Sequence, residues 1–201
     1  MSADAAERRE LSGLHERTSE RFERTLAAVG VAPGCGDGCD ACCVDGLTVW
    51  QLEADAVVDW LLRDATMAHR QAFRPGPEGA CVFLREGSCQ VYPVRPYVCR
   101  SQGAVLRWYE ADGDDADGDD AVERRDTCPV HLRDVSLARL PDAALFDIGP
   151  AEADLAALAS RQLGALGGRG LPQRVGLRAL GMDLALKVAS AANGGSKTNG
   201  R

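Results

Sequence analysis

The sequence predicts a mainly α-helical, single small domain with one short β-hairpin, in which N- and C-terminal helices flank a cysteine-rich centre. Three observations lead to this fold class. All eight cysteines of the 201-residue chain lie between positions 35 and 128. The segments on either side carry apolar residues at spacings of three and four, which is the period of an amphipathic helix. Within the centre, two short apolar segments are joined by a turn that contains glycine, which is typical of a hairpin.

The expected organisation has four parts. Residues 1–30 form an N-terminal amphipathic helix, 31–135 a cysteine-cluster metal-binding domain, 136–190 C-terminal helices that pack on it, and 191–201 a disordered tail. The tail is rich in Ala, Asn, Gly and Ser and has no apolar periodicity. A chain of this length buries roughly 70% of the surface that its unfolded form exposes, so a core can form without cross-links.

The N-terminal helix is expected from about Asp4 to Val29. Its apolar face carries Leu11, Leu14, Thr18, Phe22, Leu26 and Val29. Gly30 and the Pro33-Gly34 pair end the helical pattern. His15 and His69 both lie in helical segments and are expected at the surface. A helix that packs on the domain's own core is favoured over one that binds a partner.

The central elements follow from local signals. Thr48 can cap a helix from about Val49 to Met67. The residues from Cys81 to Tyr92 read as a hairpin, and Pro96 favours the first turn of a short helix that carries Cys99. Further helices are expected around Leu155, Leu158 and Leu163, and around Val175, Leu180, Leu184 and Val188. The acidic stretch 110–120 lacks the glycine and the final Glu of a calcium-binding EF-hand loop in the required places, so a solvated loop is expected.

Composition excludes several classes of protein. The hydrophobic share of 45% and the charged share of 26% are those of a globular domain. No apolar run reaches the roughly 18 residues of a membrane-spanning helix, and the net charge of −7 argues against broad nucleic-acid binding. The N-terminus has no apolar stretch like that of a signal peptide, so we expect a cytoplasmic, and from its Ala-, Arg- and Gly-rich composition bacterial, protein. In a reducing cytoplasm, clustered cysteines bind metals or act in catalysis more often than they form disulfides.

The cysteines form two groups with ligand-like spacing. The first group is Cys35, Cys39, Cys42 and Cys43, and the second is Cys81, Cys89, Cys99 and Cys128. Glycines at 34, 36 and 38 let the backbone curl so that several sulfurs can point at one centre. Adjacent Cys42 and Cys43 cannot easily point the same way in an extended chain, so they serve two centres, or one binds while the other packs. All eight cysteines are candidate metal ligands in a cysteine-rich metal centre.

This ordered set of motifs resembles the zinc- or iron-chelating cysteine-cluster family of bacteria, called CxxCxxCC or YkgJ-type. The resemblance covers about residues 35 to 102. The motifs that carry it are the first cysteine group, Cys81 with Phe83-Leu84, Cys89 with Tyr92, Arg95-Pro96 and Cys99-Arg100. The first gap holds three residues here instead of two, which leaves the geometry at Cys35 open, and Cys128 lies beyond the matched core.

The resemblance implies a protein that chelates zinc, iron or an iron–sulfur cluster such as [4Fe–4S] through its cysteines. Some relatives resemble the flagellin lysine methylases, so a cluster-dependent redox or methyl-transfer enzyme is the alternative. The spacing from Cys35 to Cys42 is also that of radical S-adenosylmethionine enzymes, but Ala41 replaces their usual aromatic residue and no strand–helix alternation follows. Arg95 and Arg100, which flank Cys99, are candidate cofactor-binding residues because cations stabilise thiolates. His131 is spaced like a ligand from Cys128, but an ordinary surface or capping role is favoured. The sequence names no substrate and no protein partner.

Overall fold

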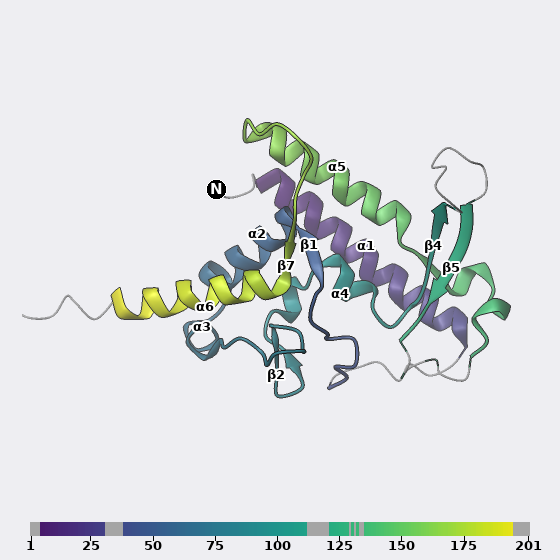
Figure 1. Cartoon of the computed structure of the whole chain (residues 1–201), viewed down its shortest axis with the longest axis horizontal. Helices are drawn as coiled ribbons and strands as arrows, with labels where there is room; N and C mark the ends of the chain where they lie inside the picture. The colour runs from purple at the N-terminus through teal and green to yellow at the C-terminus, as the bar shows by residue number, and fades with distance from the viewer. Residues whose placement is uncertain are drawn as a thin grey trace, which may run out of the picture.

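The computed structural model describes residues 5–30, 38–111, 121–128, 130, 132 and 135–194. Two long helices, α1 (Ala5–Val29) and α5 (Gly149–Ala165), lie side by side, and a small sheet closes one end of this pair (Figure 1). Helix α6 (Leu177–Gly194) extends at the other end. The chain is therefore mainly helical, as expected. None of the described helices combines the length and the apolar character needed to cross a membrane.

Helix α1 confirms the expected N-terminal helix, but the position of His15 was predicted wrongly. Leu11, Leu14 and Thr18 are buried as the periodicity indicates. The residue His15 is only 7% exposed, and its Nε2 atom lies 3.1 Å from Oε1 of Glu53. Helix α1 is covered by α4 (Tyr97–Ser101) as well as by α5, so its buried face is wider than its apolar residues alone suggest.

The single helix expected over residues 49–67 forms only over 51–64 and not at its two ends. Instead, β1 (Thr48–Trp50) pairs in antiparallel fashion with β7 (Arg174–Gly176), so that Val49 faces Val175 across the ladder. Helix α2 (Gln51–Asp59) begins only after this strand and continues as a π-helix over Trp60–Asp64. The carboxylate of Glu53 accepts the Trp50 N–H at 3.3 Å, which fixes the start of α2.

The rest of that segment is a separate helix. Helix α3 (Met67–Ala72) begins at Thr66, whose hydroxyl accepts the N–H of His69 at 3.1 Å. Thr66 therefore caps α3, the role that had been expected of Thr48 one helix earlier. His69 is half-buried, and its Nε2 atom lies 2.7 Å from the carbonyl oxygen of Gln90.

The hairpin and the short helix in the cysteine-rich centre are confirmed. Strands β2 (Leu84–Arg85) and β3 (Ser88–Cys89) pair in antiparallel fashion. The two residues between them, Glu86 and Gly87, both have positive φ, at 51° and 74°. Such a two-residue turn matches the twist of the flanking strands. After a 3₁₀ turn at Tyr92–Val94, Pro96 precedes α4, the helix that carries Cys99.

A three-stranded sheet was not anticipated from the sequence. Strand β4 (Val105–Ala111) lies between β5 (Ala121–Asp126), to which it is antiparallel, and β6 (Leu145–Asp147), to which it is parallel. The loop expected at 110–120 therefore starts two residues too early, since Glu110 and Ala111 belong to β4. Residues 112–120 lie outside the described part of the chain. Two 3₁₀ turns, Leu137–Arg139 and Asp142–Ala144, precede β6.

The C-terminal helices are present with shifted ends. Helix α5 matches the expectation, whereas Val175 lies in β7 and α6 starts at Leu177. Helix α6 continues to Gly194, four residues into the segment expected to be a tail, because Ala191 and Ala192 favour a helix. Residues 195–201 lie outside the described part. The apolar face of α6 shares one core with Cys81, Val82 and Phe83.

Candidate metal centre

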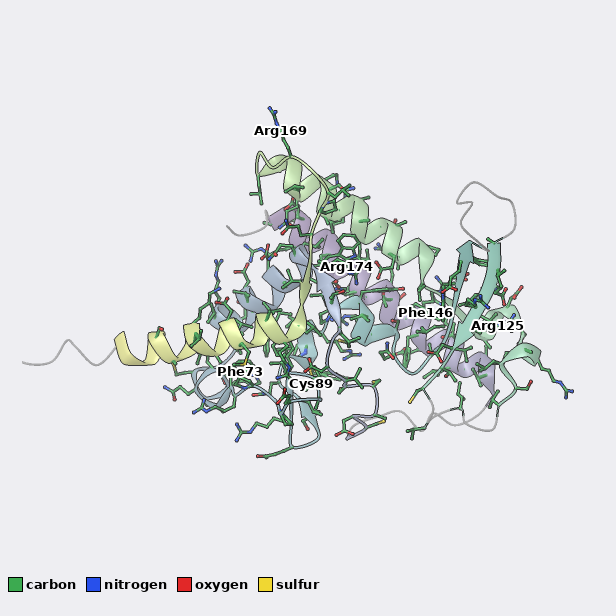
Figure 2. The ribbon with its side chains drawn as sticks, in the orientation of Figure 1. Phe73, Cys89, Arg125, Phe146, Arg169 and Arg174 are labelled. Atoms are coloured by element: carbon green, nitrogen blue, oxygen red, sulfur yellow. The ribbon has the colours of Figure 1, made fainter. Side chains whose placement is uncertain are left out.

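Five cysteines line a single pocket of about 180 Å³, which we call the thiol pocket. They are Cys42, Cys43, Cys81, Cys89 and Cys99. The first two come from the loop before β1, the next two from the hairpin segment, and Cys99 from α4. Cys89 is labelled in the lower part of Figure 2, below the start of α6. Segments far apart in the sequence thus bring their sulfur atoms to one place.

Backbone hydrogen bonds hold two of these segments together. The N–H of Cys81 donates to the carbonyl oxygen of Cys43 at 2.8 Å, and Val44 forms an isolated antiparallel bridge with Ala80. The N–H of Gly76 donates to the carbonyl oxygen of Val82 at 2.6 Å. A Cβ at Gly76 would lie 2.5 Å from the carbonyl oxygen of Cys81, so this approach requires glycine.

A buried carboxylate positions the helix that carries Cys99. Glu53 of α2 is 2% exposed, and its Oε1 accepts the N–H of Tyr97, the first residue of α4, at 2.7 Å. The same oxygen atom lies 3.1 Å from Nε2 of His15 on α1. Glu53 therefore joins α1, α2 and α4 behind the thiol pocket. It was not anticipated as a site residue, because its partners lie on segments remote in sequence.

The remaining wall of the pocket is apolar and cationic. Its other lining residues are Phe22, Leu47, Phe83, Val91, Tyr92, Arg95, Pro96, Arg100 and Gln102. Both arginines predicted as cofactor-binding residues thus face the pocket. Arg100 is held by hydrogen bonds to Arg95 O at 2.7 Å, Pro93 O at 3.1 Å and Ser19 Oγ at 3.2 Å.

Arg95 is held differently from Arg100. Its guanidinium carbon lies 3.9 Å from the centre of the Tyr92 ring, and no carboxylate in the described part of the chain forms an ion pair with it. Tyr92 is 58% exposed, so this stacked pair stands at the mouth of the thiol pocket. A fixed guanidinium with free N–H groups suits a planar anion.

Burial and mutual proximity disfavour thiolates in the pocket. Burial raises the pKa of Cys99, and the neighbouring Cys81 and Cys89 sulfurs raise that pKa further. Burial likewise raises the pKa values of Cys81 and Cys89, although the Arg95 cation partly offsets the effect at Cys89. Several thiolates in one small volume repel one another, so a bound metal cation would relieve that repulsion.

The two vicinal cysteines shift each other's pKa in opposite directions. The Cys42 thiol donates a hydrogen bond to the Cys43 sulfur, which raises the pKa of Cys42 and lowers that of Cys43. Cys43 is therefore the first of the two to become a thiolate. Both cysteines line the thiol pocket, so neither is a remote packing residue.

Two of the predicted ligands that the structure describes do not line the thiol pocket. Cys39 and Cys128 do not line the described wall of the thiol pocket, and Cys128 is buried just after β5. Cys35 and His131 lie outside the described residues. Phe22 of α1, which forms part of the wall, was recognised from the sequence only as a core residue of its helix.

The donor set fits a thiophilic metal, but the sulfur atoms are not arranged as a finished cage. Within the described ranges, no three His, Cys, Asp or Glu side chains are grouped as a ready metal site. Cysteine sulfur is the ligand that zinc and iron–sulfur clusters prefer. All five cysteine side chains line the same pocket, which is the observation that favours a shared metal centre.

Comparison with known proteins supports the same chemistry. Residues 34–129 match the family model CxxCxxCC, which is described as "Putative zinc- or iron-chelating domain". The central part of this chain, just under half of its residues, is similar to this family. The resemblance drawn from the cysteine spacing is thereby confirmed, and the matched region extends as far as Cys128. A search of curated proteins and a search of solved structures each gave no match.

The matched region does not contain the whole core that surrounds the thiol pocket. Phe22 of α1 lies before the matched region, and the apolar face of α6 lies after it. The family match indicates a zinc- or iron-chelating function. The elements outside it are additional walls and supports for the same pocket.

Proposed function

We propose that the thiol pocket binds iron as an iron–sulfur cluster, with Cys42, Cys43, Cys81, Cys89 and Cys99 as the candidate ligands. The observation that carries this proposal is the convergence of five cysteines from three segments on one pocket. A closed zinc site needs four thiolates at about 2.3 Å from the ion. An iron–sulfur cluster is also held by four cysteines, so five candidate thiols suffice for either centre.

The size of the pocket favours a cluster over a single ion. Its volume of about 180 Å³ would hold roughly six waters at about 30 Å³ each. A single tetrahedral zinc ion sits inside its own ligand shell and requires no such space. The cations of Arg95 and Arg100 line the same pocket and would offset the negative charge of several thiolates.

Cysteine variants test this ligand set. Cys99→Ser and Cys43→Ser should each lower the metal content per chain and the melting temperature together, because metal binding at thiolate sites contributes to folding stability. Cys128→Ser is the matched control: it replaces a buried cysteine that does not line the thiol pocket, so metal content should stay at the wild-type value. Equal metal loss in all three variants would contradict the assignment.

One observation favours the second candidate, a cluster-dependent redox or methyl-transfer enzyme. The stacked Arg95–Tyr92 pair at the pocket mouth has no carboxylate partner within the described residues, and Phe22, Leu47 and Val91 offer an apolar wall. A substrate that carries a carboxylate could bind there, beside the metal. The described sheets do not form the partial barrel of alternating strands and helices that is typical of radical S-adenosylmethionine enzymes.

A binding experiment separates the two candidates. S-adenosylmethionine, which carries a carboxylate, is added to the iron-loaded protein while its absorption and electron paramagnetic resonance spectra are recorded. An enzyme of the methyl-transfer class should show a saturable change that Arg95→Gln weakens and that Arg85→Gln on β2 leaves intact. A spectrum that S-adenosylmethionine does not alter would support metal chelation alone.

A further inference from the structure

Helix α6 lies outside the CxxCxxCC match but directly contacts the segments that carry two cysteines of the thiol pocket. Arg178, near its start, forms an ion pair with Asp45, two residues after Cys43. Its Nη2 atom also donates to the carbonyl oxygens of Pro77 at 2.8 Å and Ala80 at 2.6 Å. Ala80 immediately precedes Cys81. One guanidinium therefore connects the Cys43 segment to the Cys81 segment.

A backbone hydrogen bond holds the Asp45 carboxylate beside Arg178. The N–H of Gly46 donates to Oδ1 of Asp45 at 2.9 Å. Arginine is charged throughout the physiological range, and its planar fork of N–H groups can serve one carboxylate and two carbonyl oxygens at once. Lysine, with a single ammonium group, cannot reproduce that geometry.

Packing on the next turn of α6 fixes the same segment from its other side. Gly181 lies against Val82, the residue after Cys81, and a methyl group at Gly181 would overlap both γ-carbons of that valine. Val82 is buried in the core that α6 completes. In addition, the N–H of Leu177 donates to the carbonyl oxygen of Leu47 at 2.9 Å, at the end of the loop that carries Cys42 and Cys43.

We propose that α6 is part of the metal-binding unit and that Arg178 is a positioning residue, which holds Cys43 and Cys81 at the separation that a shared metal centre requires. This inference rests on the proposed metal-binding function of the thiol pocket. Arg178 acts through the backbone of Asp45, Pro77 and Ala80 and does not itself bind metal. Residues that orient metal ligands typically change metal affinity by about 10- to 100-fold when they are replaced.

The test measures metal affinity and apo stability separately in the full-length protein. Affinity is obtained by competition between the folded protein and a chelator for zinc, and again for iron after anaerobic reconstitution. Arg178→Gln should weaken metal binding by about 10- to 100-fold. Arg178→Lys should weaken metal binding by less. Asp45→Asn retains the two contacts of Arg178 with carbonyl oxygens, so its loss of affinity should lie between those of the two Arg178 variants. Arg161→Gln is the control, because Arg161 forms an exposed inter-helix ion pair with Glu10 away from the pocket.

The outcomes divide as follows. If Arg178→Gln lowers the melting temperature of the apo protein but its chelator competition matches wild type, Arg178 is only structural and the proposal is wrong. If Arg178→Gln does not fold, Asp45→Asn decides in its place by the same comparison. An equal loss of affinity in Arg161→Gln would also overturn the proposal. A wild-type protein that binds neither metal would instead contradict the proposed function itself, which keeps the two failures distinct.

Discussion

Glu53 is the most informative single residue for the link between fold and site. Its carboxylate is 2% exposed and faces His15 Nε2 at 3.1 Å, the Tyr97 N–H at 2.7 Å and the Trp50 N–H at 3.3 Å. Removing this carboxylate leaves its buried hydrogen-bond partners without an acceptor. Each orphaned buried donor costs about 1–3 kcal/mol, although such costs do not add fully among neighbours.

We therefore expect Glu53→Ala to lower the free energy of unfolding by about 4 kcal/mol, a large part of the roughly 5–15 kcal/mol that stabilises a typical domain. Glu53→Gln keeps one acceptor oxygen for the Tyr97 N–H but places an amide NH₂ near a second donor. We therefore expect this variant to lower the free energy of unfolding by about 1–2 kcal/mol. Because Tyr97 begins the helix that carries Cys99, both variants should also bind less metal.

The assay is urea unfolding of the apo and metal-loaded proteins, followed by circular dichroism, with metal content measured on the same samples. Glu10→Gln is the matched control, because it removes a carboxylate from an ion pair whose two side chains are each 55% exposed. Exposed pairs of this kind contribute about 0–1 kcal/mol. A loss below about 1 kcal/mol in Glu53→Ala would refute the reasoning that this buried network positions α4.

Two further predictions follow from the thiol pocket and its surroundings. Burial raises the pKa values of Cys81, Cys89 and Cys99 above the ordinary value of 9.0. Above about pH 9 these thiols therefore lose their protons more readily in the unfolded chain than in the folded protein. The apo protein should become less stable as the pH rises through this range. Urea unfolding between pH 7 and pH 10 checks this, and Cys99→Ser should show a shallower decline; a flat profile in the wild type would contradict it. Replacing residues 112–120 with a short glycine-containing turn should leave metal content and melting temperature unchanged, because Ala111 already pairs with Ala121 across that segment. Metal loss in the shortened protein would show that the segment contributes to the site.

The sequence predicted the elements whose signals are local. Helix α1, the β2–β3 hairpin and α4 are all found. Each was predicted from residues within the element itself: the apolar spacing along α1, the Glu86-Gly87 turn, and Pro96 before α4. The cysteine spacing likewise predicted the family that the model match confirms. These features depend on neighbours within a few residues, which a sequence displays directly.

Elements that depend on distant partners were not predictable in the same way. The local sequence around Val49 predicts a helix. In the structure Val49 lies in β1, because it pairs with Val175 of β7, more than a hundred residues later in the chain. Strand β4 is stabilised by β6, which lies well downstream in the chain. The same limit applies to the site. Five of the cysteines predicted as ligands line one pocket, but Glu53 and Arg178 act only through contacts with segments remote in sequence.

The most direct test of the central claim is the metal content and absorption spectrum of the full-length protein after anaerobic purification. Thiolates suit both zinc and iron–sulfur clusters, so direct measurement must distinguish them. The account predicts a brown protein with several irons per chain and a broad visible band that bleaches on reduction or exposure to air. A colourless protein that holds one or two zinc ions would contradict the cluster assignment and favour a closed four-thiolate site. Finding no metal under either condition would contradict metal binding by the thiol pocket altogether.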